Sequence, residues 1–289
     1  MKLFFLFFIL AIHLCAIDKI NVGLYVQEKV NIKNIKFITS VVEKSINQNN
    51  KKVNINIKTY YNPKKILKDF KQNKVKVILL RSYFYFNNKN KLSGEFDTKW
   101  HLQFGKSKYQ QYYLIANKDA NTKDIFNNKD SYSIITHAGY MNSQLWFDYL
   151  KYSKTKKTKK KFKYIYTKKF NQLSSKVFFN KKNLSVLRKE DYESALELNP
   201  QLKKRIKIIY KSKTIFSTYI AFTHKSLTKQ EKKNIFDLAK NITKILDKSR
   251  ITDSMEILLI PSETQDDFIE LDSFFSRYEK YKKIYLKKN

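Results

Sequence analysis

The sequence predicts an α/β protein of two lobes, each built on a mostly parallel sheet flanked by helices. Strand and helix periodicities alternate along the first hundred residues, and the same alternation restarts near residue 112. Of the 289 residues, 42% are hydrophobic, which is enough for a core in each lobe. Strands joined by helices run in the same direction, so the alternation predicts parallel pairing.

The first element is an apolar N-terminal run. Residues 3–12 are almost wholly apolar, and this run is about half as long as the roughly 20 residues that cross a bilayer. We interpret residues 1–16 as a signal peptide cleaved near Ala16, so the mature protein is exported. Lipoprotein processing requires a small residue where Leu14 precedes Cys15, so we expect no lipid anchor. The mature chain then has no cysteine for a disulfide or a nucleophile.

The next elements belong to the first lobe. Apolar residues alternate as a strand over residues 20–26, recur at helical spacing over residues 35–46, and alternate again over residues 53–57. This order predicts a strand, a helix and a second strand.

A further helix and strand complete a βαβαβ unit. Asn62 can cap a helix that has Pro63 at its first position, and residues 75–80 form a nearly continuous apolar strand, as expected when both faces of a sheet are covered. In open sheets of this kind the ligand crevice lies beyond the carboxyl ends of the strands. The candidate cleft residues of this lobe are Tyr60, Tyr61, Arg81 and Ser82.

The pattern restarts in the second half of the chain. We expect strands at residues 112–116, 132–135 and 184–187, and a capping box at residues 228–231 opens a later helix. β-rich stretches bracket this second unit, and we interpret them as hinge strands. The predicted domains are the signal peptide (1–16), lobe 1 (17–110 and 220–260), lobe 2 (111–219) with hinge strands near 111–117 and 214–222, and a C-terminal helix with a basic tail (261–289).

A tight turn follows one of these strands. Gly139, one of only four glycines, stands where the apolar strand that includes Ile135 meets a helix. Such a turn aims backbone N–H groups and polar side chains at one point, which suits an anion. The candidate anion-binding residues are Thr136, His137, Ala138, Gly139 and Tyr140. Gln111 and Glu190 are further candidates, and Glu190 has a role at a helix start as its alternative.

Two of the charged candidates also have a structural interpretation. Arg81 or a protonated His137 would give an anion charge-assisted hydrogen bonds. Alternatively, Arg81 ends its strand in solvent, and His137 caps or packs beside a helix start.

Four segments carry a resemblance to a known family. They are the opening strand at residues 20–24, the segment 112–119, the turn 136–140 and the stretch 198–202. Together with the export signal they resemble the phosphate/phosphonate-type periplasmic substrate-binding proteins of ABC transporters, over roughly residues 20–245. The resemblance implies a type II periplasmic binding fold. In that family a Ser-Thr-Ser-Gly-Tyr-like turn binds phosphonate oxygens through hydroxyls and helix N-terminal amides, and here the turn reads Thr-His-Ala-Gly-Tyr.

The resemblance implies a periplasmic solute-binding protein. Such a protein would capture a small anionic ligand, phosphonate-like or phosphate-like, between two closing lobes for uptake by an ABC permease, as a monomer without a cofactor. An exported sensory or adaptor module that signals to a membrane receptor is the alternative. We expect no catalytic residues, because His101, His137 and His224 lack metal-ligand spacing and the sequence has no nucleophile-elbow or Walker-type motif.

The net charge of +34 raises a second alternative, a secreted protein that binds polyanions. The charge is almost all lysine, with five arginines, whereas arginine is preferred for bidentate phosphate and base contacts. Abundant Lys, Asn, Ile, Phe and Tyr is also what AT-rich coding DNA produces, so we do not expect nucleic-acid binding. Residues 151–169 contain ten lysines, and we interpret them as a loop leading into a strand rather than as a polyanion patch.

Overall fold

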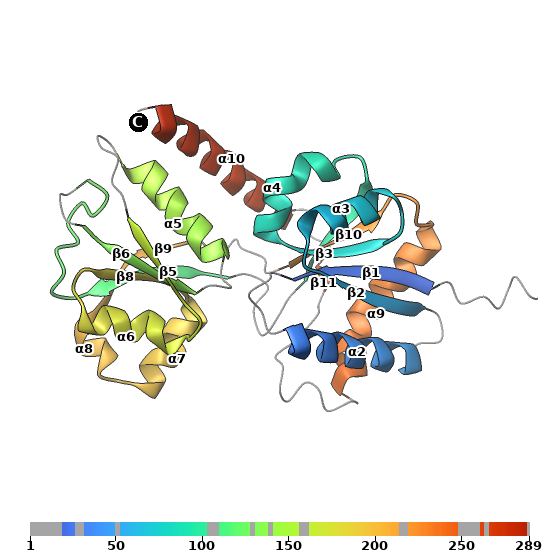
Figure 1. Cartoon of the computed structure of the whole chain (residues 1–289), viewed down its shortest axis with the longest axis horizontal. Coiled ribbons are helices and arrows are strands. Elements are labelled where there is room, and N and C mark those ends of the chain that lie inside the picture. The colour runs from blue at the N-terminus through green and yellow to red at the C-terminus, as the bar shows by residue number, and fades with distance from the viewer. Residues whose placement is uncertain are drawn as a thin grey trace, which may run out of the picture. The chain divides into compact units, whose positions relative to one another are not determined.

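The structure is a computed structural model whose chain divides into two compact units, each assembled from segments that are distant in sequence (Figure 1). Unit 1 comprises Met1–Arg81, Asn88–Lys106 and Tyr219–Ser262, and unit 2 comprises Ser82–Asn87, Ser107–Thr218 and Glu263–Asn289. The described residues are 19–26, 32–49, 53–102, 110–127, 131–137, 141–155, 162–213, 219–247, 261–262 and 266–287. The predicted signal peptide, including Cys15, lies outside them.

Unit 1 has a six-stranded mixed sheet in the order β11-β4-β10-β3-β1-β2. Strand β1 pairs in parallel with β2 and β3, and β10 is antiparallel to both β3 and β4. The strands are β1 (Lys19–Tyr25), β2 (Asn54–Tyr60), β3 (Val77–Arg81), β4 (Phe96–Leu102), β10 (Tyr219–His224) and β11 (Pro261–Ser262). The predicted βαβαβ order is therefore present, with β10 inserted between β3 and β4.

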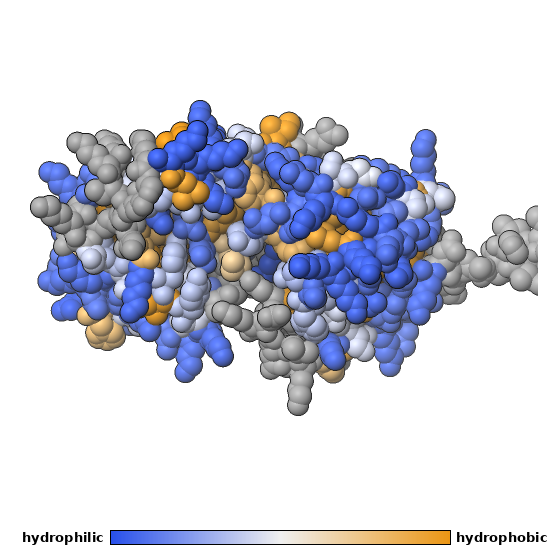
Figure 2. Space-filling view, turned by 45° about the horizontal axis from the view of Figure 1, so that its top comes forward, coloured by the Kyte–Doolittle hydropathy of each residue, from blue (hydrophilic) through white to orange (hydrophobic). Residues whose placement is uncertain are grey.

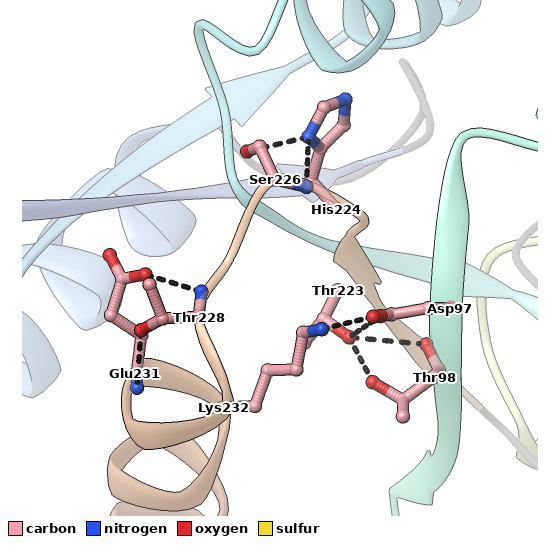
Figure 3. Close-up of polar contacts among 8 residues, drawn as sticks. All are labelled: Asp97, Thr98, Thr223, His224, Ser226, Thr228, Glu231 and Lys232. Carbon is pink, nitrogen blue, oxygen red and sulfur yellow. Dashed lines mark hydrogen bonds and ion pairs between the residues drawn. The ribbon is translucent and has the colours of Figure 1, made fainter.

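Helices cover both faces of this sheet. In Figure 1, α2 (Ile32–Asn49) and α9 (Lys229–Asp247) lie on one side of it, and α3 (Pro63–Lys71) lies on the other. The side chain of Asn62 accepts hydrogen bonds from the N–H groups of Lys64 and Lys65, so the predicted cap of α3 is confirmed. The predicted capping box of α9 is also present (Figure 3). A helix of eleven residues, α4 (Ser82–Leu92), follows β3 directly.

Unit 2 has a five-stranded sheet in the order β7-β6-β8-β5-β9. Strand β6 is parallel to β7 and β8, and β5 is antiparallel to β8 and β9. All six residues of β5 are buried, as expected for a strand covered on both faces. The elements are β5 (Tyr112–Asn117), β6 (Ser133–His137), α5 (Met141–Lys154), β7 (Lys163–Thr167), α6 (Asn171–Phe179), β8 (Asn183–Arg188), α7 (Lys189–Leu198), α8 (Leu202–Arg205), β9 (Ile206–Lys211) and α10 (Asp266–Lys287).

The two expected hinge strands overlap strands of different sheets, and residues 214–218 lie outside the described residues. The stretch at 111–117 contains β5 of unit 2, and the stretch at 214–222 includes the first residues of β10 of unit 1. Their role as hinges stays a prediction.

The C-terminal helix expected after residue 261 is α10, which packs on α5 through aromatic side chains. The ring centroids of Tyr149 and Phe274 are 4.9 Å apart, and those of Tyr152 and Tyr285 are 5.0 Å apart. Aromatic pairs at these distances stabilise packing beyond the area they bury.

The lysine-rich run at residues 151–169 is not entirely a loop leading into a strand, as we expected. Its first lysines, Lys151 and Lys154, lie in the last turn of α5 rather than in a loop. Cations there interact favourably with the carbonyl end of the helix dipole. The strand expected near residue 164 is β7, as predicted.

Hydrophilic residues dominate the face shown in Figure 2, and none of the described helices combines the length and apolar content that crossing a membrane requires.

Candidate functional site

The carboxyl ends of three parallel strands define one edge of the sheet in unit 2. These ends are His137 of β6, Thr167 of β7 and Arg188 of β8. Because β5 runs in the opposite direction, it begins at the same edge, next to Gln111. Ligands of open α/β sheets bind at such an edge.

Two residues of the predicted anion-binding turn end strand β6. Thr136 is 1% exposed, and its Oγ1 is 3.1 Å from the Oγ of the buried Ser143 on α5. The ring of His137 stacks on Phe170 with the centroids 4.2 Å apart, and its Nε2 is 3.2 Å from the carbonyl oxygen of Lys168. Nε2 donates this hydrogen bond because a carbonyl oxygen only accepts. Both side chains therefore have fixed positions at the edge.

The other three turn residues, Ala138, Gly139 and Tyr140, lie outside the described residues, and their role stays a prediction. The described chain resumes at the start of α5. There Asn142 is 9% exposed, and its Oδ1 is buried without a hydrogen-bond partner among the described residues. A buried polar group left without a partner costs about 1–3 kcal/mol. Because Oδ1 only accepts, it can pair with a donor of the ligand, such as the hydroxyl of a monoprotonated phosphonate or the ammonium group of 2-aminoethylphosphonate.

Asn142 is not among the candidates predicted from the sequence. The available signal was its place directly after the glycine turn, where a polar side chain can point at the same target as the helix amides. The glycine turn drew attention to residues 136–140, whereas the helix that follows was recognised only by its apolar pattern.

Of the remaining candidates of unit 2, Gln111 has a hydrogen-bond partner and Glu190 lies at a helix start. Gln111 donates from Nε2 to the backbone oxygen of Ser212 at 2.9 Å. Glu190 lies in the first turn of α7, where the helix dipole favours a carboxylate. Beside it, Arg188 donates to Asp191 through two hydrogen bonds of 2.9 and 2.7 Å. This geometry supports the role of Glu190 at a helix start.

In unit 1, Tyr60 ends β2 and points into the core. It is 2% exposed, and its hydroxyl donates a 2.8 Å hydrogen bond to Asp69 of α3. Burial raises the pKa of the Asp69 carboxyl, but the bond from Tyr60 and the charge of Lys58 outweigh it and hold that pKa below its ordinary value. Burial, followed by the bond to Asp69, raises the pKa of the Tyr60 hydroxyl. Tyr60 therefore has a structural partner, and we leave it out of the proposed site.

Three candidates remain: Tyr61 and Arg81 follow or end strands of unit 1, and Ser82, the next residue, begins the part of α4 that belongs to unit 2. The hydroxyl oxygen of Tyr61 is buried and has no hydrogen-bond partner in the described part of the chain. Arg81 donates from Nε to the hydroxyl of Tyr219 at 3.1 Å, which holds its guanidinium at the end of β3. Ser82 is fully buried and begins α4, whose start has no side-chain cap. An uncapped helix start presents N–H groups that suit an anion.

The sheet edge of unit 2 thus combines a helix start with hydrogen-bonding side chains, and the edge of unit 1 offers Tyr61 and Arg81. Over the described ranges, no group of three or more His, Cys, Asp or Glu side chains could hold a metal ion. The groups present can bind and orient a small anion through hydrogen bonds and the helix dipole.

No protein-family model and no curated protein matches this chain, but solved structures do. One is a binding-protein component of an ABC phosphonate transporter, PA3383 from Pseudomonas aeruginosa, which is 16% identical over 90% of this chain and 87% of that chain, with a TM-score of 0.52. PhnD1 from Prochlorococcus marinus MIT 9301, in complex with methylphosphonate, is 11% identical over 91% and 98%, with a TM-score of 0.57. XAC2383 from Xanthomonas citri, bound to ATP, is 6% identical over 92% and 98%, with a TM-score of 0.63.

At these low identities the likeness shows the fold. The chain has the two-lobed α/β fold of the type II periplasmic substrate-binding proteins of ABC transporters. The resemblance drawn from the sequence is confirmed at the level of the fold.

Proposed function

We propose that the chain is an extracytoplasmic solute-binding protein that captures a small phosphonate-like or phosphate-like anion for uptake by an ABC permease. The fold supports this, since the similar PhnD1 holds methylphosphonate and the similar PA3383 is a component of a phosphonate transporter. The protein acts in the periplasm after removal of residues 1–16, as a monomer that performs no catalysis.

The observation that carries the proposal is the group of polar side chains around the start of α5. The Thr136 hydroxyl, the His137 ring and the Asn142 amide come from the end of β6 and the first turn of this helix. A helix N-terminus stabilises an anion by about 0.3–1 kcal/mol at the surface and by up to about 2 kcal/mol when partly buried. A protonated His137 adds a charge-assisted bond of roughly 1.5–3 kcal/mol. In unit 1, Tyr61 and Arg81 provide a second set of such groups.

The direct test is calorimetric titration of the mature protein with phosphate, phosphite, methylphosphonate and 2-aminoethylphosphonate. We expect one of these anions to bind with one-to-one stoichiometry. Replacing Asn142→Ala removes the unpartnered amide and is expected to weaken that binding by about tenfold or more. The matched control is Asn199→Ala, because Asn199 is exposed at the end of α7 and is expected to leave the affinity unchanged.

The outcomes separate the ligand from its site. A folded protein that binds none of the four anions contradicts the phosphonate-like ligand. Equal affinities of the Asn142→Ala variant and the parent contradict the placement at α5. Gly139→Val is expected to disturb the turn before α5 and thereby to weaken anion binding, so it tests the same placement at a second residue.

A sensor of the same fold would bind the same ligand, so the titration does not distinguish uptake from sensing. The neighbouring genes do: an adjacent permease and ATPase support uptake, and an adjacent histidine kinase or cyclase supports the sensory alternative.

A further inference from the structure

A hollow of about 350 Å³ lies on unit 1 beside helix α3, at a place no candidate above occupies. Its lining comes from α3, from the residue after α3 and from the end of α4 (Figure 1). The lining residues are Lys64, Leu67, Lys68, Lys71, Gln72 and Lys91.

The sequence of α3 explains the lysines of this hollow. Lys64, Lys68 and Lys71 are spaced by four and three residues, so they share one face of the helix with about 5–6 Å between neighbouring Cβ atoms. Ile66 and Phe70 on the opposite face are fully buried. The helix therefore turns its apolar side inward and presents three ammonium groups to solvent in a row, and Lys91 adds a fourth from α4.

These four lysines have no acidic partner among the described residues. The ion pairs of the same unit use other lysines, such as Lys76 with Glu231 and Lys225 with Glu95. The one acid of α3, Asp69, is buried and binds Tyr60 and Lys58 instead. Four positive charges thus gather around one hollow, and their mutual repulsion favours a bound anion.

We propose that this hollow binds a short polyphosphate chain, either free or carried by a nucleotide. A single phosphate or phosphonate carries at most about two negative charges and would leave half of the lysine charge unmatched. A chain of three phosphates carries about four, which matches the four ammonium groups. Lysine binds phosphate as a compact point charge, and a volume of this size falls in the range of small-molecule sites. The inference goes beyond the proposed function, because the hollow is separate from both sheet edges.

The test is titration of the mature protein with tripolyphosphate, ATP and orthophosphate at low salt. We expect saturable one-to-one binding of tripolyphosphate, with orthophosphate much weaker. The double variant Lys68→Gln/Lys71→Gln removes two charges from the hollow and is expected to weaken tripolyphosphate binding by about tenfold. The matched control is Lys203→Gln/Lys204→Gln, which removes two exposed charges from α8 of unit 2 and is expected to leave the affinity unchanged.

Each outcome has a clear meaning. Equal affinities for ATP and tripolyphosphate identify the phosphate chain as the whole ligand, and tighter binding of ATP identifies a nucleotide. Equal losses in the two double variants would mean general attraction by the net charge of +34 and would overturn the site. So would the absence of saturable binding, or loss of tripolyphosphate binding in the Asn142→Ala variant, because that variant alters only the edge of unit 2.

Discussion

The two ends of the sheet in unit 1 differ in how their polar groups are partnered. At the amino ends of β3 and β4, side chains bind one another (Figure 3). Glu231 accepts from the backbone N–H of Thr228 at 2.6 Å and from the ammonium of Lys76 at 3.3 Å, while Lys232 pairs with Asp97. These contacts hold α9 against the strands, so the polar groups at this end of the unit stabilise the fold.

At the opposite, carboxyl end of the parallel strands of this sheet, a polar group lacks such a partner. Tyr61, which directly follows β2, has a buried hydroxyl that is unpaired among the described residues. Native structures pair nearly all buried polar groups, so exceptions require an explanation. The proposed function would account for this difference, because a ligand would pair with the unpartnered group at the carboxyl end. The following experiments test that proposal.

The largest expected effect distinguishes two adjacent tyrosines at the carboxyl end. Tyr60→Phe removes the donor to the buried Asp69 and is expected to lower the free energy of unfolding by about 1.5–3 kcal/mol, with the ligand affinity unchanged. Tyr61→Phe removes an unpaired hydroxyl, so the unfolding free energy is expected to stay equal or rise, while the ligand affinity falls. Urea unfolding and calorimetric titration of both variants measure these effects. Destabilisation by both would show that Tyr61 is scaffold too.

A smaller effect is expected at the amino end. Glu231→Ala removes one half of the capping box and the acidic partner of Lys76, so the free energy of unfolding is expected to fall by about 1 kcal/mol. The ligand affinity is expected to stay the same. The control is Glu193→Ala on α7, an exposed acid 3.8 Å from Lys189, for which about 0.3–0.5 kcal/mol is expected. Equal losses in urea unfolding would show that the capping box adds nothing to this end.

The sequence predicted the order of most elements because burial leaves a periodic pattern. The strands β1, β2 and β3 alternate or run apolar, and the caps of α3 and α9 have residues that bind backbone amides. Strand β4 was missed. Its sequence, Phe-Asp-Thr-Lys-Trp-His-Leu, has charged residues among the apolar ones, so its strand character depends on pairing with β10, more than a hundred residues away.

The sequence predicted which residues stand at the carboxyl ends of the strands, but not which of them have a hydrogen-bond partner within the protein. The rule that ligands meet the carboxyl ends of strands selected Tyr60 and Tyr61 together. Their difference depends on Asp69, which the fold places against one of them. Asn142 was missed for a similar reason, since an unpaired amide cannot be recognised until its surroundings are known.

The smallest expected effect concerns His224, a buried side chain at the amino end that, unlike its neighbours there, has an unpartnered atom among the described residues. His224 is 5% exposed, and its Nδ1 bonds Ser226, but its Nε2 is buried without a partner in the described structure. Burial lowers the pKa of the ring, and of the charges facing it Glu95 and Asp97 raise that pKa while Lys225 and Lys76 lower it further. The unfolded chain therefore binds the proton more readily than the folded chain does.

This histidine makes stability depend on pH. Its contribution is fully present above the ordinary histidine pKa of about 6.5 and is lost as the pH falls below that value. Between pH 7.5 and 5.5 the parent is expected to lose up to about 1 kcal/mol more stability than the variant His224→Phe, whose ring keeps the edge contact with Phe70 but cannot be protonated. Urea unfolding at the two pH values measures this, with His137→Phe as a control that retains the buried histidine. If the parent and His224→Phe lose the same stability between the two pH values, protonation of His224 does not cause the pH dependence.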